Sequence, residues 1–249
     1  MRKPVMAGNW KMYKTAAETT RFFEQFRDLV ERSEHCEIVI CPPYLSLPAA
    51  VAATQGSRIG IGAQNLFWAK EGAYTGEVSG PMIKSAGASH VIIGHSERRQ
   101  YFGETNETVL KKTLAALEAG LIPIVCVGET LEQREAGRTE SVIVDHCQGC
   151  TSGLTADQFG KVLIAYEPVW AIGTGKTATP EIAADAHRVV RNHVRGVYGQ
   201  SAADQLRILY GGSVKPDNIK NLMAQPEIDG ALVGGASLDP ISFASIVNF

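Results

Sequence analysis

The sequence predicts an α/β fold, a single-domain (β/α)8 barrel in which eight parallel strands are ringed by helices. Eight short β-rich apolar runs alternate with longer helical patterns, the order expected of a barrel or of an open doubly wound sheet. The segment after the first run, Ala7-Gly8-Asn9-Trp10-Lys11, lacks the glycine fingerprint of a doubly wound nucleotide-binding fold, which favours the barrel. No linker or longer repeat divides the chain, so we expect one catalytic domain over residues 1–249.

Each predicted strand is a short apolar run bounded by turn residues or helical segments. The eight runs are Val5 to Ala7, Glu37 to Cys41, Ile59 to Ala63, His90 to Ile93, Ile122 to Val127, Lys161 to Tyr166, Arg207 to Tyr210, and Gly230 to Val233. All would be parallel, so the loops after their carboxyl ends would meet at one mouth of the barrel.

The helices between these runs are predicted from their start and stop signals. Thr15 and Glu18 form a capping box at the start of the first helix. Its apolar stripe, which would pack against the sheet, consists of Phe22, Phe26, Leu29 and Val30. Later signals are Thr105 before Leu110, Leu114 and Leu117, the stop at Gly120, and the starts at Thr179-Pro180 and Asp239-Pro240.

Composition limits the classes of partner. With 249 residues, of which 45% are hydrophobic, the chain can bury a full core. A net charge of -2 and a pI near 6.3 give no overall attraction to nucleic acid or to an anionic membrane, so local groups must hold any anionic ligand. No apolar run reaches bilayer length, and Met1-Arg2-Lys3-Pro4 leads into a short strand without a cleavable signal. We therefore expect a cytoplasmic protein that acts on a small molecule.

The cysteines do not indicate a disulfide framework or a metal site. There are five, unevenly placed: Cys36, Cys41, Cys126, Cys147 and Cys150. The last two have the C-x-x-C spacing, but no second pair accompanies them and they fall in a predicted helix before Gly153. We interpret them as incidental reduced thiols.

The most informative segment begins with the predicted strand that ends at Tyr166. That strand delivers Glu167 into the loop Pro168–Lys176, which starts with proline and contains two glycines. A carboxylate at a strand end before such a loop is typical of a general base beneath a closing lid, whereas a solvated acid is the alternative. The end of the loop superficially echoes a nucleotide P-loop, but the required first glycine would fall at Trp170, so the motif fails.

Other chemically active side chains also follow predicted strand ends. They are Asn9 and Lys11; His95, Ser96 and Glu97; Cys126 and Glu129; Gly211-Gly212-Ser213; and Gly234-Gly235. Their joint occurrence at one mouth indicates an active site more strongly than any one of them.

Each of these residues has a functional and a structural interpretation. His95 opens a predicted helix, whose positive end disfavours imidazolium, so a neutral ring could relay a proton; a structural histidine is the alternative. Lys11 could stabilise an oxyanion or could be a surface cation. The glycine pairs suit a phosphate after the last two strands, although they could also be ordinary tight turns.

These segments resemble the triosephosphate isomerase family over essentially the whole chain. The matching signatures, in their expected order, are Ala7-Gly8-Asn9-Trp10-Lys11-Met12, Gly94-His95-Ser96-Glu97-Arg98-Arg99, Ala165-Tyr166-Glu167-Pro168-Val169-Trp170, Tyr210-Gly211-Gly212-Ser213-Val214 and Val233-Gly234-Gly235-Ala236-Ser237-Leu238. The resemblance implies a TIM barrel that interconverts dihydroxyacetone phosphate and D-glyceraldehyde 3-phosphate, a step of glycolysis and gluconeogenesis, without cofactor or metal.

The resemblance also implies a role for each site residue. Glu167 would move the proton between neighbouring carbons, neutral His95 would polarise the oxygens, and Lys11 with Asn9 would support the enediolate. The phosphate would be held by Gly173, Ser213, Gly234 and Gly235, and the supporting residues would be Ser96, Glu97 and Cys126.

Family members are usually homodimers in which the loop after the third strand enters the partner. Here that loop is Gln64–Glu77, and Thr75 is its expected tip. Its three aromatic residues would be costly to expose together, which favours a homodimer over a solvated loop. The chain departs from the family pattern at two places. Tyr13 stands where the family pattern has asparagine, and the C-x-x-C pair is not a hallmark of the family.

Three rival functions remain to be compared. A metal-dependent epimerase needs ligands at strand ends, but His146, His187 and His193 fall in predicted helices. A Schiff-base aldolase needs a lysine on an inner strand, and only Lys161, at the wrong end, is offered. A noncatalytic scaffold would be expected to lose the acid, the histidine or the phosphate loops, and none is lost.

Overall fold

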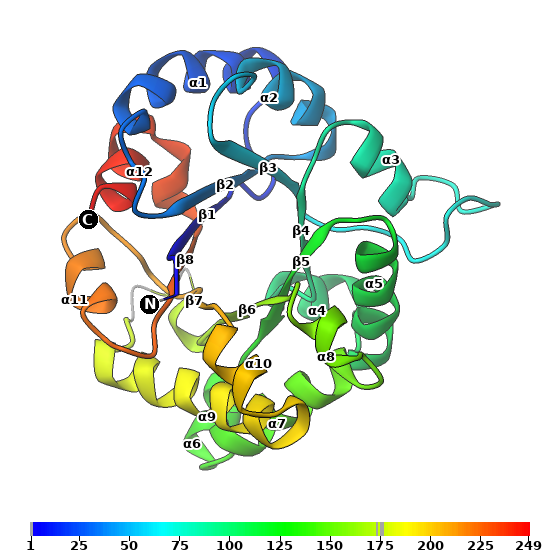
Figure 1. Cartoon of the computed structure of the whole chain (residues 1–249), viewed down its shortest axis with the longest axis vertical. Coiled ribbons are helices and arrows are strands. Elements are labelled where there is room, and N and C mark those ends of the chain that lie inside the picture. The colour runs from blue at the N-terminus through cyan, green and yellow to red at the C-terminus, as the bar shows by residue number, and fades with distance from the viewer. Residues whose placement is uncertain (1, 173, 175–176) are drawn as a thin grey trace.

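The computed structural model describes residues 2–172, 174 and 177–249 and contains a closed barrel of eight parallel strands in sequence order (Figure 1). The strands are β1 (Val5–Asn9), β2 (Glu37–Cys41), β3 (Ile59–Ala63), β4 (His90–Ile93), β5 (Ile122–Val127), β6 (Leu163–Tyr166), β7 (Ile208–Tyr210) and β8 (Gly230–Val233). All eight predicted strands are present. The first extends to Asn9, and the sixth and seventh begin slightly later than expected.

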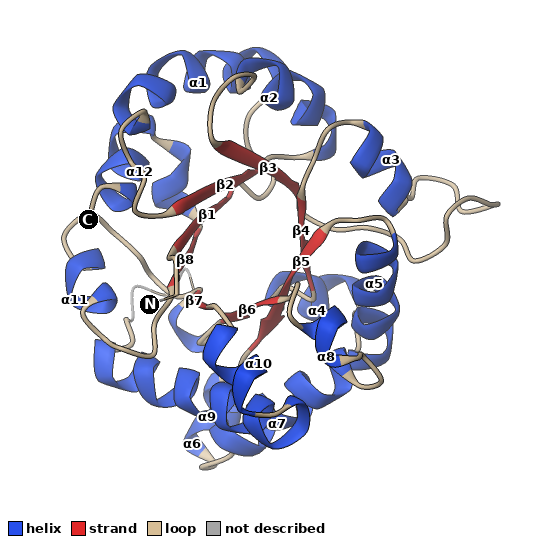
Figure 2. Ribbon diagram, in the orientation of Figure 1, coloured by secondary structure: helices blue, strands red, loops and turns tan. Residues whose placement is uncertain are grey.

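Helices surround the strands on the outside (Figure 2). The α-helices are α1 (Ala16–Val30), α2 (Leu47–Ala53), α3 (Gly80–Ser85), α4 (Ser96–Phe102), α5 (Asn106–Glu118), α6 (Leu131–Glu135), α7 (Thr139–Thr151), α8 (Ala156–Phe159), α9 (Pro180–Tyr198), α10 (Gln200–Gln205), α11 (Ile219–Met223) and α12 (Pro240–Val247). Short 3-10 helices are η1 (Tyr44–Ser46), η2 (Val169–Ala171) and η3 (Gly235–Leu238). In the described part of the chain, no helix is both long and apolar enough to cross a bilayer.

The predicted helix starts are confirmed by side-chain caps. The Thr15 hydroxyl accepts a hydrogen bond from the Glu18 amide, and the Glu18 carboxylate accepts one from the Thr15 amide. Thr105 forms a second capping box at the start of α5, whereas the Thr179 and Asp239 side chains each accept one backbone amide at the starts of α9 and α12. These caps fix where each helix leaves the loop at the barrel mouth.

The core has two apolar layers because successive strand residues point to opposite faces of the barrel wall. The first layer is formed by side chains at alternate positions of the strands: Val5, Ala7, Val39, Cys41, Ile92, Ile124, Cys126, Leu163, Ala165, Leu209 and Leu232. The other layer joins strands to helices and includes Met6, Phe22, Phe26, Ile40 and Phe243. Burial on both faces explains why the strands are almost continuously apolar.

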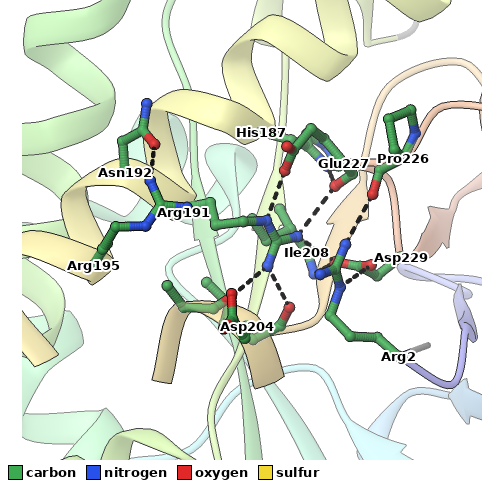
Figure 3. Close-up of polar contacts among 12 residues, drawn as sticks. Arg2, His187, Arg191, Asn192, Arg195, Asp204, Ile208, Pro226, Glu227 and Asp229 are labelled. Carbon is green, nitrogen blue, oxygen red and sulfur yellow. Dashed lines mark hydrogen bonds and ion pairs between the residues drawn. The ribbon is translucent and has the colours of Figure 1, made fainter. Parts of the chain in front are cut away.

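A buried ionic cluster ties α9 to the amino-terminal ends of β7 and β8 (Figure 3). The Arg191 guanidinium donates to the carboxylates of Glu227 and Asp229, at 2.7 Å each, and Asp229 also accepts from the Ile208 amide at 2.9 Å. The Arg2 guanidinium approaches Asp229 to 2.5 Å from the other side. The cluster lies at the end of the barrel away from the mouth. Both carboxylates are paired with an arginine, so neither leaves an unpaired buried charge.

The loop between β3 and α3 projects away from the barrel (Figure 1). Within it, the Phe67 ring stacks on Trp68 with centroids 4.1 Å apart and lies 4.5 Å from the Tyr74 ring. Trp68 and Tyr74 nevertheless remain 37% and 48% exposed. The loop is therefore stiffened by its own aromatic residues while presenting an apolar surface.

Candidate active site

The strand ends converge on a cavity of about 310 Å³ at the carboxyl end of the barrel. The structure brings seven of the predicted site residues to its walls: Asn9, Lys11, His95, Glu167, Ser213, Gly234 and Gly235. Gly173 lies outside the described residues. Thr75 is in the projecting loop and does not line this cavity.

Glu167 follows β6 directly and is almost fully buried, at 2% exposure. Its carboxylate accepts a hydrogen bond from the Ser96 amide at 2.9 Å, and its other oxygen lies 2.8 Å from Nε2 of His95. Burial by itself would raise the pKa of Glu167, but the His95 ring and the Ser96 amide outweigh it and lower the pKa below its usual value. The carboxylate is thus ionised and held at the cavity wall.

His95 is the last residue before α4 and caps this helix with its own ring. Nδ1 accepts a hydrogen bond from the Glu97 amide at 3.2 Å, so the ring proton in this arrangement belongs to Nε2. Burial disfavours the charged ring, but the Glu167 carboxylate outweighs burial and raises the pKa of His95. Any positive charge on this ring therefore depends on its contact with Glu167.

Lys11 is held in an uncommon backbone conformation, with φ 51°. Its amide donates to the Asn9 side chain at 3.0 Å, and its carbonyl accepts from the Gln64 side chain at 2.8 Å. Nζ lies 2.5 Å from a carboxylate oxygen of Glu97. Gln64 was not predicted as a site residue, although its place directly after β3 was a usable signal.

Cys126 lies in β5 behind Glu167 and is fully buried. Burial, together with the nearby Glu167 charge, raises the pKa of the Cys126 thiol well above its usual value. A thiol that stays protonated is not a nucleophile. The supporting role predicted for Cys126 is therefore compatible with packing against the base.

Glu129, which the sequence placed at the mouth, does not line the 310 Å³ cavity. Its carboxylate accepts hydrogen bonds from Tyr166 Oη at 3.1 Å and from Trp170 Nε1 at 2.9 Å. The Arg134 guanidinium lies 3.3 Å from the same carboxylate and covers the Trp170 ring at 4.6 Å. Glu129 thus anchors η2, the first turn of the loop after Glu167, a role that spacing alone did not reveal.

The glycine segments after β7 and β8 serve two different needs. A Cβ at Gly211 would lie 2.9 Å from Cγ of Glu167, and one at Gly212 would lie 2.2 Å from the Tyr210 hydroxyl oxygen, so both positions are required for packing. A Cβ at Gly235 would meet nothing within 4 Å, and one at Gly234 only Lys11 Cε at 3.6 Å. This second segment leaves open space beside the Lys11 ammonium, where an anion fits.

The described residues do not place side chains where a metal-dependent epimerase or a Schiff-base aldolase would need them. Within the described residues, no three His, Cys, Asp or Glu side chains are grouped so that they could hold a metal ion. His146 lies in α7, and His187 and His193 lie in α9, outside the barrel wall. Lys161 precedes the start of β6 and is remote from the mouth.

Comparisons with known proteins agree on one family. A family model described as triosephosphate isomerase matches residues 4–249. The triosephosphate isomerase of Solibacter usitatus is 72% identical over 249 residues and that of Moorella thermoacetica 56% identical; the alignments cover all of this chain and 100% and 99% of those proteins. A crystal structure of triosephosphate isomerase from Bartonella henselae superposes with a TM-score of 0.89 at 39% identity, covering 99% of this chain and 98% of that one.

Proposed function

The chain belongs to the triosephosphate isomerase family and interconverts dihydroxyacetone phosphate and D-glyceraldehyde 3-phosphate, and from this premise we propose how its side chains divide the reaction. Glu167 is the base that removes a proton from the carbon beside the carbonyl and returns it to the neighbouring carbon. The observation that carries this assignment is a buried, ionised carboxylate at the wall of the cavity, 2.8 Å from an imidazole nitrogen.

His95 acts as the electrophile that polarises the substrate oxygens. When the Glu167 carboxylate turns from the ring toward substrate, the main cause that raises the pKa of His95 is removed. Burial and the amino-terminal end of α4 then favour the neutral ring, whose Nε2 proton can be donated to a substrate oxygen. The Glu97 amide keeps Nδ1 as the acceptor and so fixes this tautomer.

Lys11 and Asn9 stabilise the enediolate. The ammonium lies at the cavity wall and carries the positive charge that the anionic intermediate requires. Glu97 holds Lys11 Nζ at 2.5 Å, and the Asn9 side chain fixes the Lys11 amide, so both groups are positioned before substrate arrives.

We place the phosphate between Ser213 and the Gly234–Gly235 segment, which line the cavity together with Lys11. Open space at these glycines permits close approach of the backbone, as phosphate binding requires. Gly173 of the lid completes this set by family resemblance. Closure of the lid excludes water and strengthens the interactions of Glu167, His95 and Lys11 with the intermediate.

Replacing Glu167 by Asp tests the assignment of the base. Shortening the side chain by one methylene moves the carboxylate away from the reacting carbon, so we expect kcat to fall by about 100-fold or more with little change in unfolding temperature. Steady-state kinetics in a coupled isomerase assay measure this loss. Glu140→Asp, at an exposed position of α7, is the matched control, and near-normal turnover in Glu167→Asp would refute the assignment.

A homodimer is the proposed assembly, and Thr75 is proposed to reach the partner's mouth. Exposed large apolar side chains lie in the loops and short helices that follow β1 to β4, which are neighbours in the barrel: Met12, Tyr13, Leu45, Trp68, Tyr74, Tyr101 and Phe102. Exposed apolar side chains on neighbouring segments are typical of a protein interface.

We also propose that residues 1–249 act as one domain and that the enzyme works in the cytoplasm. All five cysteines are buried free thiols, which fits a reducing compartment. Cell fractionation with the isomerase assay tests the location, and activity confined to an oxidising compartment would contradict it.

A further inference from the structure

Arg99, on α4, holds the backbone that leads into His95. Its Nε donates a hydrogen bond to the Gly94 carbonyl at 3.0 Å, which is the peptide group immediately before His95. Gly94 has φ 72°, and a Cβ there would lie 2.9 Å from the Val109 side chain. The turn into His95 therefore requires glycine at position 94. Arg99, in the first turns of α4, holds the Gly94 carbonyl in place by its hydrogen bond.

The remaining nitrogens of Arg99 are held by two other helices. Nη1 donates to Asn106 Oδ1, at the start of α5, at 2.8 Å, and Nη2 donates to Cys150 Sγ, on α7, at 3.2 Å. The Cys150 thiol also donates to Asn106 Oδ1 at 3.6 Å, and Asn106 in turn donates to Asp145 at 2.9 Å. The guanidinium is thus held through all three of its nitrogens, a set of contacts that a lysine could not reproduce.

This network also gives a role to the C-x-x-C segment. A Cβ at Gly149 would lie 2.7 Å from Cβ of Asn106, so the absence of a side chain at Gly149 admits Asn106 to the network. Cys150 is fully buried and supplies the sulfur acceptor. The segment therefore supports Arg99 from behind, which its interpretation as incidental thiols did not foresee.

We propose that Arg99 is a positioning residue for the isomerisation, acting through the Gly94 carbonyl to set the place of the His95 ring. This inference rests on the electrophilic role proposed for His95. Arg99 does not line the 310 Å³ cavity, and its three guanidinium nitrogens donate to protein groups, so it acts on the ring and not on substrate. A small displacement of a catalytic group is sufficient to slow a reaction by about 100-fold.

The test uses the full-length enzyme with Arg99→Ala and Arg99→Lys. We expect kcat to fall by about 10- to 100-fold in both variants while KM changes by less than about threefold, because the groups that bind phosphate are untouched. The ¹⁵N chemical shifts of the His95 ring should move with the loss. Arg188→Ala, an exposed arginine of α9, is the control and should retain wild-type kcat.

Chemical rescue separates positioning from general support of the fold. Arg99 lines a cavity of about 780 Å³ beside the lid, which gives a small cation access to the vacated place. Methylguanidinium should therefore raise the kcat of Arg99→Ala several-fold and leave the kcat of His95→Gln unchanged. A loss of kcat that methylguanidinium leaves unchanged would overturn the proposal.

A double variant identifies the route of action. If Arg99 works through His95, adding Arg99→Ala to His95→Gln should cost less than about threefold further in kcat, whereas independent effects would multiply. Multiplying losses, or wild-type kcat in both Arg99 variants, would overturn the inference and leave the role of His95 intact. Wild-type kcat in His95→Gln alone would instead refute the electrophile itself, and the inference with it.

Discussion

At the scale of single residues, the environment of each side chain decides what it can do. Glu167 and His95 are in contact, and each shifts the pKa of the other against the effect of burial. His95 lowers the pKa of Glu167, and Glu167 raises the pKa of His95. Their position after strand ends made both predictable from the sequence. Arg99 was not, because it acts on the Gly94 backbone carbonyl and not on the cavity, and hydrogen bonds to carbonyls leave no residue pattern. Gln64 also donates to a backbone carbonyl, but its place directly after β3 could have indicated it.

His187 makes the stability of the fold sensitive to acid. It is fully buried on α9, where its Nδ1 lies 3.1 Å from the Glu227 carbonyl and Arg191 lies nearby. Burial lowers the pKa of His187 to about 3, so between pH 6.5 and pH 3 the unfolded chain binds a proton that the folded chain does not. The stabilisation is complete above pH 6.5 and is lost as the pH falls through this window.

We predict that His187→Gln removes part of this pH dependence. Between pH 7 and pH 5 the wild-type free energy of unfolding should fall by about 2 kcal/mol more than that of the variant, as measured by urea denaturation. His35→Gln, at an exposed position, should follow the wild type. Parallel curves for wild type and His187→Gln would contradict the prediction.

At the scale of elements, strands were easier to predict than helices. Strand runs in a closed parallel barrel are buried on both faces and therefore stand out as apolar. The run predicted from Lys161 begins two residues later because the turn hydrogen bonds that follow α8 take the amides of Lys161 and Val162. The apolar stripe predicted for α1 was wrong at Leu29, which is 44% exposed, whereas Phe23, outside the predicted stripe, is fully buried.

Two glycines in different elements should respond oppositely to alanine. A Cβ at Gly128, after β5, would lie 1.8 Å from the Glu167 carbonyl oxygen, so Gly128→Ala must displace the backbone of the base. We expect it to lower kcat by at least about tenfold and the free energy of unfolding by about 1–3 kcal/mol. Kinetics and chemical denaturation measure both.

Gly196→Ala is the matched comparison. Gly196 lies in α9, its φ is not positive, and a Cβ there would meet nothing within 4 Å. Alanine should stabilise the protein by about 0.5–1 kcal/mol at unchanged kcat, since it favours the helical backbone. If Gly128→Ala left kcat unchanged and did not lower the free energy of unfolding, the claim that the close approach of Gly128 to the Glu167 carbonyl positions the base would be wrong.

At the scale of the whole molecule, the projecting loop is the segment through which we propose that two chains associate. A bulky charge at its tip would oppose insertion into a partner, so Thr75→Arg should shift the proposed homodimer toward monomer and lower activity at nanomolar enzyme concentration. Sedimentation velocity and concentration-dependent kinetics measure both. Thr20→Arg, on the outer face of α1, should leave the dimer intact, and a dimeric Thr75→Arg of full activity would contradict the proposal.

The overall architecture was predictable because the alternation of strands and helices left a barrel or a doubly wound sheet, and the missing nucleotide fingerprint favoured the barrel. What the sequence could not provide was the arrangement of groups that meet only in space. The ionic cluster of Arg2, Arg191 and Asp229 joins positions more than 200 residues apart, and no local pattern announces it.

Pairing of β8 with β1 has a consequence for biosynthesis. Val5 lies beside Gly230 in this ladder, so the ring is completed only when β8 has left the ribosome. Until then the emerging chain carries two unpaired sheet margins that can associate with other nascent chains. Premature termination anywhere before β8 should consequently yield aggregates, and no shorter working enzyme.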